Sequence, residues 1–234
     1  MQRESIIENR SLIIGNSDGI GLAFTKKLLE KDWSVLGLSR SDLPVEHPEY
    51  THSVIDVRES KYPGVLNAMV DRLSSLDLCV YCAGIGEELD ISHMDDEACI
   101  IEVNLLGLVK TASVIIPAMI SQGRGHFIGL SSVADEILSP VAPSYHASKA
   151  GFSNYLEGLA LSAKPWGVNI TNVRFGFVDT KMAKGDVKPF QMTVDRAVDH
   201  LLYCLKKKPM RYTAPRIVIP LVKFRGWMLR RRLR

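Results

Sequence analysis

Tyr145 and Lys149 lie four positions apart in the stretch SPVAPSYHASKAG, which has the pattern of a helix. Four residues are slightly more than one helical turn, so the phenol and the ammonium would share a face. The pair is either one turn of an amphipathic helix or a reaction centre that moves a proton. Because this spacing arises by chance in many helical proteins, the rest of the chain must decide between the two.

Two further polar side chains stand where a reaction centre would need them. Ser132 follows a predicted strand at 125–131 and lies thirteen residues before Tyr145. A serine at a strand end and a tyrosine at a helix start would converge above the sheet. Asn104 lies within a long apolar helix predicted at 94–119, where its amide needs a partner. It is either a satisfied core asparagine or a residue that holds a water.

A glycine-rich turn joins the first predicted strand, 10–14, to the first predicted helix, 19–31. Glycines permit a tight turn and let the backbone approach a pyrophosphate without a Cβ in the way. The following helix offers free N–H groups and the positive end of its dipole to the phosphates. The alternative is a turn that merely needs glycine, but the spacing favours a dinucleotide. The predicted contacts are Gly15, Asn16, Ser17, Asp18, Gly19, Ile20 and Gly21.

The second predicted strand, 33–38, is followed by Ser39 and Arg40. In dinucleotide folds a carboxylate here binds the adenosine ribose and implies NAD. A guanidinium flanked by the hydroxyls of Ser39 and Ser41 would instead hold a 2′-phosphate. This favours NADP(H) over NAD(H), although Asp18 places a negative charge near the phosphates and Arg40 is alternatively a solvated surface residue.

Two further strand ends give weaker signals for the adenosine side. Asp56 closes a strand predicted at 53–57 and would accept from the adenine amino group, with Val57 as a backbone contact. Ala83 and Gly84 end a strand predicted at 76–83 and let the backbone pass beside the adenosine.

Predicted strands and helices alternate along the whole chain. The remaining strands are predicted at 168–175 and 216–219, and the remaining helices at 62–73, 144–163 and 194–206. Most strands are continuous apolar runs, which is typical of a parallel sheet covered on both faces, the doubly wound α/β fold. We expect a single domain over residues 1–234, with ligands beyond the carboxyl ends of the strands.

On these residues the chain resembles the short-chain dehydrogenase/reductase (SDR) family in its compact form, over about residues 10–220. The motifs are Gly15-x-x-x-Gly19-x-Gly21, Asp56-Val57, Ala83-Gly84, Asn104, Ser132, Tyr145-x-x-x-Lys149 and FGFVDT ending in Thr180, in family order and at family spacing. The resemblance implies a Rossmann-type fold and an NAD(P)-dependent oxidoreductase that reduces a ketone or aldehyde, or oxidises the corresponding alcohol.

The resemblance also implies roles for individual residues. Tyr145 would protonate the carbonyl oxygen as general acid, and Lys149 would lower the tyrosine pKa from about 10 and hold the nicotinamide ribose. Ser132 would hydrogen-bond the substrate oxygen, and Asn104 would position a water in a proton relay that reaches Lys149. Beyond strand six, the predicted cofactor contacts are Gly176, Val178 and Thr180.

Three positions depart from the family pattern: Ile14, the pair Tyr81-Cys82, and Phe175. All three concern support of the cofactor and leave the four catalytic positions intact. They keep open an alternative in which the chain is a non-catalytic dinucleotide-binding sensor or scaffold. A nucleotide-sugar epimerase or dehydratase is disfavoured because those relatives add a substrate domain.

The composition is that of an ordinary globular chain, with 46% hydrophobic and 24% charged residues. Cys79 and Cys82 have C-x-x-C spacing inside an apolar strand pattern. A zinc site would need two more ligands, and no Cys or His pair has matching spacing, so we expect free thiols. The polar N-terminus and the lack of an apolar run of 18 residues predict no signal peptide and no spanning helix. We expect a cytoplasmic protein.

Positive charge gathers at the end of the chain. From Lys206 onward there are eleven Lys and Arg residues and no Asp or Glu, against 18 basic and 26 acidic residues before it. The basic tail at 221–234 is interpreted first as a solvated or partner-bound end, then as a membrane-surface segment. We expect no nucleic-acid partner. The two long helices are too apolar for each to expose a face, and the resemblance implies that they pack against their twins in a homodimer or homotetramer. The segments 134–144 and after Thr180 predict an apolar substrate.

Overall fold

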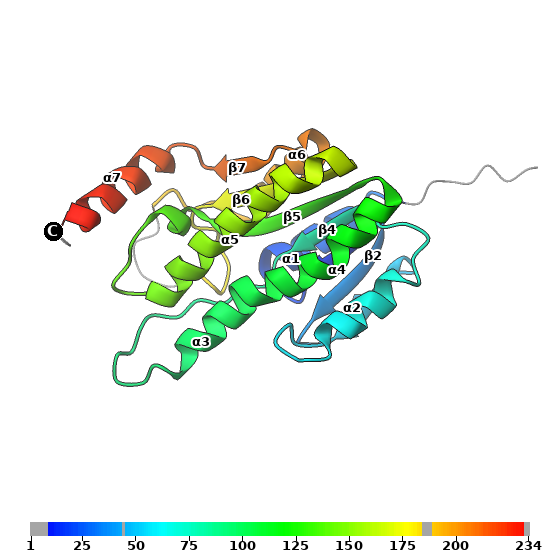
Figure 1. Cartoon of the computed structure of the whole chain (residues 1–234), viewed down its shortest axis with the longest axis horizontal. Helices are drawn as coiled ribbons and strands as arrows, with labels where there is room; N and C mark the ends of the chain where they lie inside the picture. The colour runs from blue at the N-terminus through cyan, green and yellow to red at the C-terminus, as the bar shows by residue number, and fades with distance from the viewer. Residues whose placement is uncertain (1–8, 44, 184–188, 232–234) are drawn as a thin grey trace, which may run out of the picture.

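The computed structural model describes residues 9–43, 45–183 and 189–231. They form a single seven-stranded parallel sheet in the order β3-β2-β1-β4-β5-β6-β7, with helices on both faces (Figure 1). The strands are β1 (Arg10–Ile14), β2 (Ser34–Ser39), β3 (Tyr50–Val54), β4 (Leu78–Tyr81), β5 (Gly125–Ser132), β6 (Val168–Phe175) and β7 (Arg211–Ala214). The predicted doubly wound α/β fold is confirmed.

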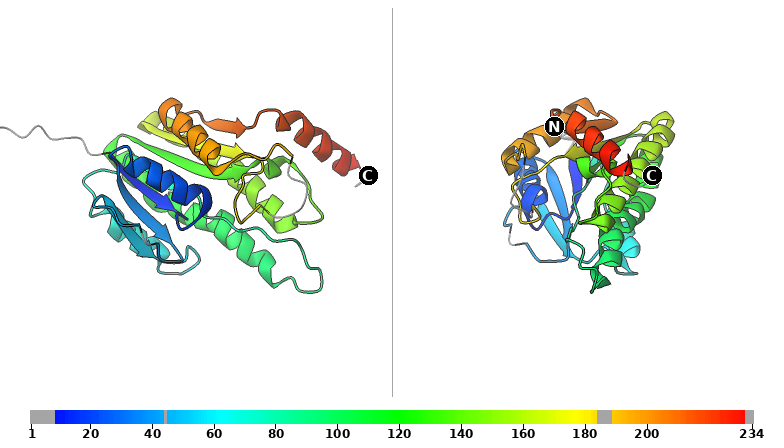
Figure 2. Two further views of the ribbon diagram at one scale, coloured as in Figure 1. Left: turned by 180° about the vertical axis from the view of Figure 1, so that it is seen from behind. Right: turned by 90° about the vertical axis from the view of Figure 1, so that its left-hand side faces the viewer.

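Helices cover each face of the sheet because successive strand residues point to opposite sides. In β1, Leu12 and Ile14 enter one core, whereas Ile13 enters the other. The helices α2 (Tyr62–Val70), α4 (Gly107–Gln122) and α5 (Pro143–Ala163) cover the first core, in front of the sheet in Figure 1. The helices α1 (Gly19–Leu29) and α6 (Val194–Lys207) cover the second, seen from behind in Figure 2.

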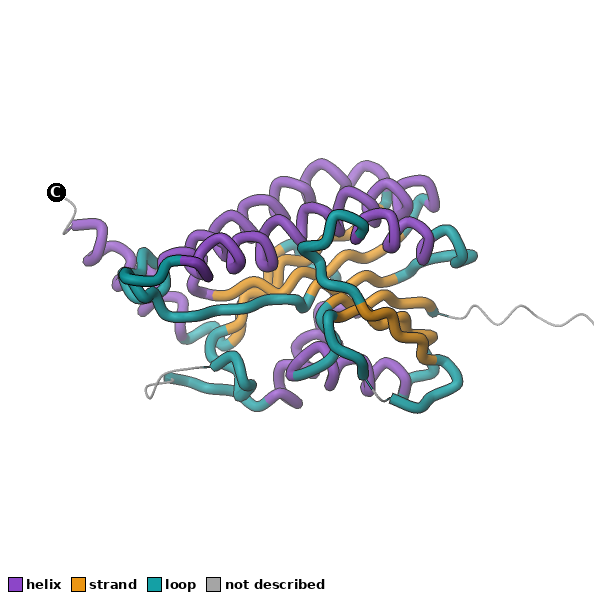
Figure 3. Tube along the Cα trace, turned by 90° about the horizontal axis from the view of Figure 1, so that it is seen from below, coloured by secondary structure: helices purple, strands orange, loops and turns teal. Residues whose placement is uncertain are grey.

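The chain order reverses between β1 and β4, which are neighbours in the sheet. A doubly wound sheet opens a crevice for ligands at this point, outside the carboxyl ends of the strands. The loops after β1, β4, β5 and β6 meet at that edge. Figure 3 shows the sheet between its two helix layers.

The predicted helix at 94–119 is continuous but consists of three parts: α3 (Asp95–Ile101), a π-helical turn η1 (Glu102–Leu106) and α4. By length and composition alone, the helix Asp95–Gln122 could cross a membrane, and it is the one such helix among the described residues. However, 56% of its most apolar window is buried inside the fold. Here it packs on the sheet as a core helix between α2 and α5.

The strand predicted at 216–219 is wrong. The seventh strand is Arg211–Ala214, which pairs in parallel with β6 from Asn172 to Phe175. Pro215 has no N–H for a further ladder bond, so the strand ends before it. The third strand also lies earlier than predicted, at Tyr50–Val54, so Asp56 and Val57 follow the strand in a turn.

The basic tail is not an irregular end over its described part. Residues Val218–Arg231 form the helix α7, drawn in red in Figure 1 beyond the carboxyl end of β7. The last three residues of the predicted tail, 232–234, lie outside the described part of the chain. Two apolar residues of the predicted strand, Val218 and Ile219, begin this helix, in which Val218 and Val222 are buried one helical turn apart.

Candidate active site

Ser132 and Tyr145 meet at the carboxyl edge of the sheet. Ser132 is the last residue of β5 and caps the short 3₁₀ helix η2 (Val133–Glu136), its hydroxyl oxygen accepting from the Ala134 N–H at 3.2 Å. Tyr145 is on the first turn of α5, and its hydroxyl is hydrogen-bonded to Ser132. The Tyr145 ring lies against Gly86, where a Cβ would stand 3.0 Å from it.

Lys149 lies one turn further along α5 and is almost fully buried, with 4% of its surface exposed. Its Nζ donates to the Leu130 carbonyl at 3.0 Å and lies 5.8 Å from the centre of the Tyr145 ring. Burial lowers the pKa of Lys149 to about 8, while Cys82 and Asp135 act in the opposite direction. The ammonium is therefore held at the site in a state that is easily deprotonated.

The pKa of Tyr145 lies above its ordinary value. Burial is the main cause, and the negative charge of Asp135 adds to it, while the hydrogen bond with Ser132 acts to lower the pKa. The Lys149 ammonium donates to the Leu130 carbonyl, and its expected lowering of the Tyr145 pKa stays a prediction. Tyr145 is thus a protonated phenol at neutral pH.

Asn104 is fully buried in the π-helical turn and has partners for both ends of its amide. Its Oδ1 accepts from the Ile85 N–H at 2.8 Å, and its Nδ2 donates to the Ile85 carbonyl at 2.9 Å and to Ser148 Oγ at 3.0 Å. A Cβ on Gly84 would stand 3.4 Å from Asn104 Oδ1 and 3.7 Å from Lys149 Nζ. The two side chains are therefore close neighbours, while the predicted water relay between them stays a prediction.

The glycine-rich turn has the conformation that glycines require. Gly15 has a φ of +83°, and a Cβ on it would stand 2.5 Å from the Ala83 nitrogen. A Cβ on Gly21 would stand 2.3 Å from the Gly15 carbonyl oxygen. The loop therefore folds tightly against the end of β4 and leads directly into the N-terminus of α1.

The negative charge of Asp18 is offset by a partner that the sequence did not reveal. Asp18 caps α1 through the Gly19 N–H at 2.7 Å and forms an ion pair with Lys181 at 2.8 Å. The pKa of Asp18 is lowered by the hydrogen bond from Lys181 and then by that from Gly19. Thr180 contacts the same loop, since its Cγ2 is 3.3 Å from where a Gly19 Cβ would be. The segment after β6 thus closes over the glycine-rich turn.

Two predicted cofactor contacts have their side chains turned away from the crevice. Asn16 is fully buried, and its Nδ2 donates to the Tyr50 hydroxyl at 2.7 Å. The Ser39 hydroxyl donates to the Ser41 carbonyl at 2.7 Å and lies 3.2 Å from His52 Nε2. Arg40 next to it is exposed. Arg40, rather than Ser39, is therefore the side chain available to a 2′-phosphate.

Asp56 is bound by a cation that sequence reasoning missed. Arg58 donates to Asp56 Oδ2 from Nη2 at 2.8 Å and from Nε at 3.1 Å, and this hydrogen bonding lowers the pKa of Asp56. The predicted acceptance from an adenine amino group would have to compete with this ion pair. Arg40 also acts on Asp56, so two guanidinium groups lie near the end of β3. The D-x-R spacing was the available signal.

The remaining predicted contacts line the same edge. Val57 and Val178 are buried, and Val178 bridges to Met192. Partly buried positions are Ser17, Ile20, Ala83, Gly84, Gly176 and Thr180. Cys79 and Cys82 are free thiols. The described residues contain no group of three or more His, Cys, Asp or Glu residues placed to hold a metal ion.

A buried charge network supports η2, and sequence reasoning missed it as well. Arg174 in β6 donates from Nε to Asp135 Oδ2 at 2.6 Å and from Nη2 to Asp135 Oδ1 at 2.5 Å. Ser153 donates to the same carboxylate at 2.5 Å and is bonded to Ser131, the neighbour of Ser132, at 2.8 Å. The network thus connects β6 and α5 to the segment that holds Ser132 in place.

A dinucleotide fits these residues. The glycine-rich turn brings bare backbone to the switch point, where a Cβ on Gly15 would overlap Ala83, and Gly84 lies beside Asn104 and Lys149. The helix N-terminus, Lys149 and Arg40 supply groups for phosphates and ribose hydroxyls.

Known proteins are similar to this chain in sequence. The sequence model for short chain dehydrogenases matches residues 9–189. An uncharacterized oxidoreductase of Staphylococcus epidermidis is 26% identical over 187 residues, covering 76% of this chain and 81% of its own. Carbonyl reductase family member 4 of Xenopus tropicalis is 27% identical over 182 residues, 74% of this chain and 77% of its own.

The fold also matches solved structures. A short chain dehydrogenase from Burkholderia cenocepacia, in complex with NADP, superimposes with a TM-score of 0.83 at 22% identity, over 97% of each chain. At this identity the likeness shows the fold alone. Together with the family match over most of the sequence, it places the chain in the short-chain dehydrogenase/reductase family of oxidoreductases.

Proposed function

We propose that this chain is an NADP(H)-preferring carbonyl reductase that reduces an apolar ketone or aldehyde, or oxidises the corresponding alcohol. The observation that carries the proposal is the meeting of Ser132, Tyr145 and the buried Lys149 beside the glycine-rich turn. The nicotinamide would supply or accept the hydride, so that the protein provides binding, orientation and the proton.

Tyr145 is suited to act as the acid in reduction. Because burial raises its pKa, its hydroxyl carries a proton at neutral pH and can donate it to a carbonyl oxygen. Ser132 Oγ accepts from the Ala134 N–H and is hydrogen-bonded to the Tyr145 hydroxyl, so its own proton lies beside the phenol and would turn to a substrate oxygen that binds there. The two hydroxyls then approach the same oxygen, where negative charge develops during reduction.

The preference for NADP(H) rests on charge at the end of β2. Arg40 is exposed, and the carboxylate typical of NAD-binding relatives is replaced by Ser39. The objection from Asp18 weakens because Lys181 pairs with it at 2.8 Å. A matched pair of titrations with NADPH and NADH tests the preference directly.

An apolar substrate is proposed from the rim of the site. Leu138 and Val141 follow η2 and are about half exposed, at 45% and 52%. Met182, 41% exposed, reaches towards Gly84, where a Cβ would stand 3.7 Å from its Cε. Part of the segment predicted to form a lid, 184–188, lies outside the described residues.

A homo-oligomer is proposed from the outer surface of the two long helices. On α5 an exposed row of small residues includes Ala147, Ala150 and Gly158, and on the neighbouring π-helical turn Leu106 is 44% exposed. A second copy could approach closely along this surface. Light scattering at micromolar concentration that found only a monomer would contradict the proposal.

The decisive experiment compares Tyr145→Phe with Tyr155→Phe, a half-buried tyrosine ten residues further along the same helix. NADPH binding is followed by fluorescence, and turnover by a panel of apolar aldehydes and ketones. We expect the wild type and Tyr155→Phe to turn over, while Tyr145→Phe binds NADPH and loses at least about 100-fold in kcat. NADPH binding without reduction by any of the three proteins would favour the alternative function, a dinucleotide-binding sensor or scaffold.

A further inference from the structure

The helix α7 packs on the body of the protein through one narrow face. Val218 and Val222 are buried, and Gly226, one turn further, lies against η2. A Cβ on Gly226 would stand 2.8 Å from the Glu136 carbonyl oxygen, so the helix approaches η2 as closely as its backbone allows. This face accounts for the docking of α7 on the fold.

The opposite side of α7 carries a second apolar stripe that nothing in the described chain covers. Its members are spaced by three or four residues, as one side of a helix requires, and each is roughly half exposed. They are Leu221 at 55%, Phe224 at 58% and Met228 at 44%, with Trp227 beside them at 51%, and Ile217, 59% exposed, lies in the turn just before the helix.

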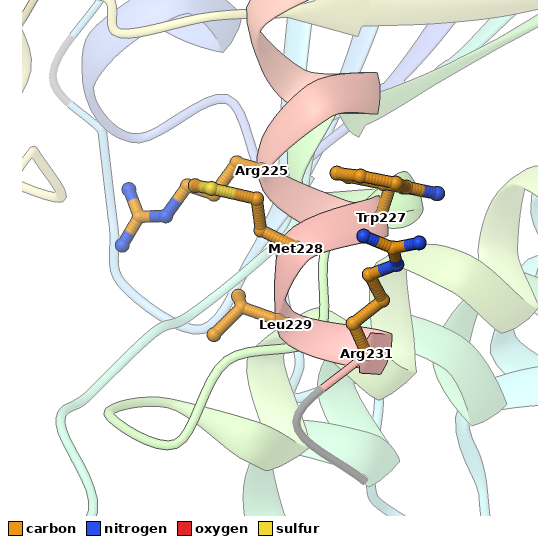
Figure 4. Close-up of a pocket in the computed structure, with 5 residues that line it drawn as sticks. All are labelled: Arg225, Trp227, Met228, Leu229 and Arg231. Carbon is orange, nitrogen blue, oxygen red and sulfur yellow. The ribbon is translucent and has the colours of Figure 1, made fainter. Parts of the chain in front are cut away.

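Positive charge borders this stripe. Figure 4 shows Trp227 and Arg231 on one side of the helix and Arg225 with Met228 on the other. The Arg231 guanidinium lies 4.3 Å from the centre of the Trp227 ring, a cation–π contact that holds the charge at the margin of the apolar surface. From Lys206 to the end, the sequence has eleven basic residues and no acidic one.

The position of α7 relates this stripe to the site. The helix extends beyond the carboxyl ends of the strands, the edge at which Ser132 and Tyr145 lie (Figure 1). It rests on η2, which begins directly after Ser132. The exposed Leu138 and Val141 follow η2 in the chain and belong to the rim of the same site.

We propose that α7 is an interfacial helix that docks this edge of the protein on an anionic phospholipid surface. Its apolar stripe would enter the boundary between headgroups and acyl chains, while the flanking arginines contact lipid phosphates. Trp227 suits this depth because its ring is apolar and its N–H is polar. The site would then open next to the bilayer, where apolar carbonyl compounds partition.

A second copy of the chain is a poorer occupant of the stripe. Pairing two α7 helices face to face would bring together two helices that each carry four basic residues and no acidic one, and like charges repel. An anionic bilayer offers both an apolar interior and the complementary charge. The proposal does not depend on the catalytic assignment, because it concerns a surface outside the reacting residues.

The test uses the full chain and large vesicles of phosphatidylcholine, with or without 30% phosphatidylglycerol, in a sedimentation assay. The double variant Leu221→Gln/Phe224→Gln removes the centre of the stripe and leaves the buried face of α7 intact. Val54→Gln is the matched control, because Val54 is also 58% exposed and lies on β3 at the opposite edge of the sheet. Light scattering of all proteins follows the oligomeric state.

We expect binding to the anionic vesicles only, weakened by high salt, and at least tenfold weaker for the double variant while Val54→Gln binds as the wild type. Quenching of Trp227 by brominated lipid, lost in Trp227→Phe, would place the helix in the interface. Absence of binding by the wild type overturns the proposal. Equal binding by the wild type and the double variant also overturns it. If the wild type does not bind vesicles and the double variant forms a smaller oligomer than the wild type, the stripe contacts a second copy of the chain instead.

Discussion

The buried ion pair between Arg174 and Asp135 gives the sharpest prediction for stability. The side chains are 3% and 2% exposed, and two guanidinium nitrogens hold the two carboxylate oxygens. Replacing Arg174 by Met leaves Asp135 buried with only Ser153 as a donor among these partners. A buried charge that loses its partner is far more costly than the pair itself is stabilising.

The expected loss for Arg174→Met is about 3–5 kcal/mol of unfolding free energy, a large part of the total for most domains. Arg211→Met is the matched control, because Arg211 binds Glu157 in the same two-nitrogen geometry at 2.6 and 2.8 Å but is 49% exposed. That variant should lose only about 0.2–1 kcal/mol, since water solvates the remaining carboxylate. The contrast between the two variants isolates burial.

Urea unfolding followed by circular dichroism, at one protein concentration, measures both losses. The double variant Arg174→Met/Asp135→Asn should be more stable than Arg174→Met, because the amide carries no charge and still accepts from Ser153. Equal losses for Arg174→Met and Arg211→Met would refute the reasoning, as would a double variant that is less stable than the single one.

Three further predictions concern the cofactor site and pH. Arg40→Ala should weaken NADPH binding at least tenfold and leave NADH binding unchanged, as measured by fluorescence titration. Arg72 is exposed at the other end of the strands, so Arg72→Ala should change the binding of neither cofactor. Gly15→Ala should impair both folding and NADPH binding because its φ is +83° and its Cβ would overlap Ala83, while Gly64→Ala, with open space around it, should be neutral or slightly stabilising in thermal unfolding. Burial lowers the pKa of His126 to about 3, so the unfolded chain takes up a proton at higher pH than the folded one. Its contribution to stability is therefore complete above about pH 6.5 and is lost as the pH falls, by about 1 kcal/mol between pH 7 and 5.5; His126→Gln should show a correspondingly smaller loss in urea unfolding.

Most of the fold could be predicted from local patterns. Mostly continuous apolar runs predicted six of the strands near their observed positions. The burial of Leu12, Ile13 and Ile14 on both faces of β1 explains why such runs indicate a parallel sheet. The meeting of two candidate catalytic residues could be predicted for the same reason. Ser132 and Tyr145 stand next to element ends, and parallel strands bring their carboxyl ends to one edge.

The end of the chain could not be read in this way. The segment 216–222 is short and mostly apolar. Periodicity over so few residues is compatible with either a strand or a helix. Tertiary packing decides for the helix, since Val218, Val222 and Gly226 are buried one turn apart and Gly226 lies against η2. The exposed stripe on the other side of α7 becomes visible only once the packed face is known.

Ion pairs between residues that are far apart in the chain likewise could not be predicted from the sequence. Asp135 and Arg174 are 39 residues apart, and Asp18 meets Lys181 only because the loop after β6 folds over the glycine-rich turn. The direction of a side chain was equally hidden: Asn16 faces Tyr50 inside the fold rather than the crevice.

By itself, then, the sequence determined the alternation of strands and helices and the family, and it singled out Asn104, Ser132, Tyr145 and Lys149 as candidate catalytic residues. These depend on period, order and spacing, which are properties of neighbouring residues. Only the tertiary structure decided which charges are paired, which side chains turn inward, and which face of α7 is left exposed. Those properties depend on burial and on contacts between distant segments, because a group's pKa, partners and solvation are set by what packs against it.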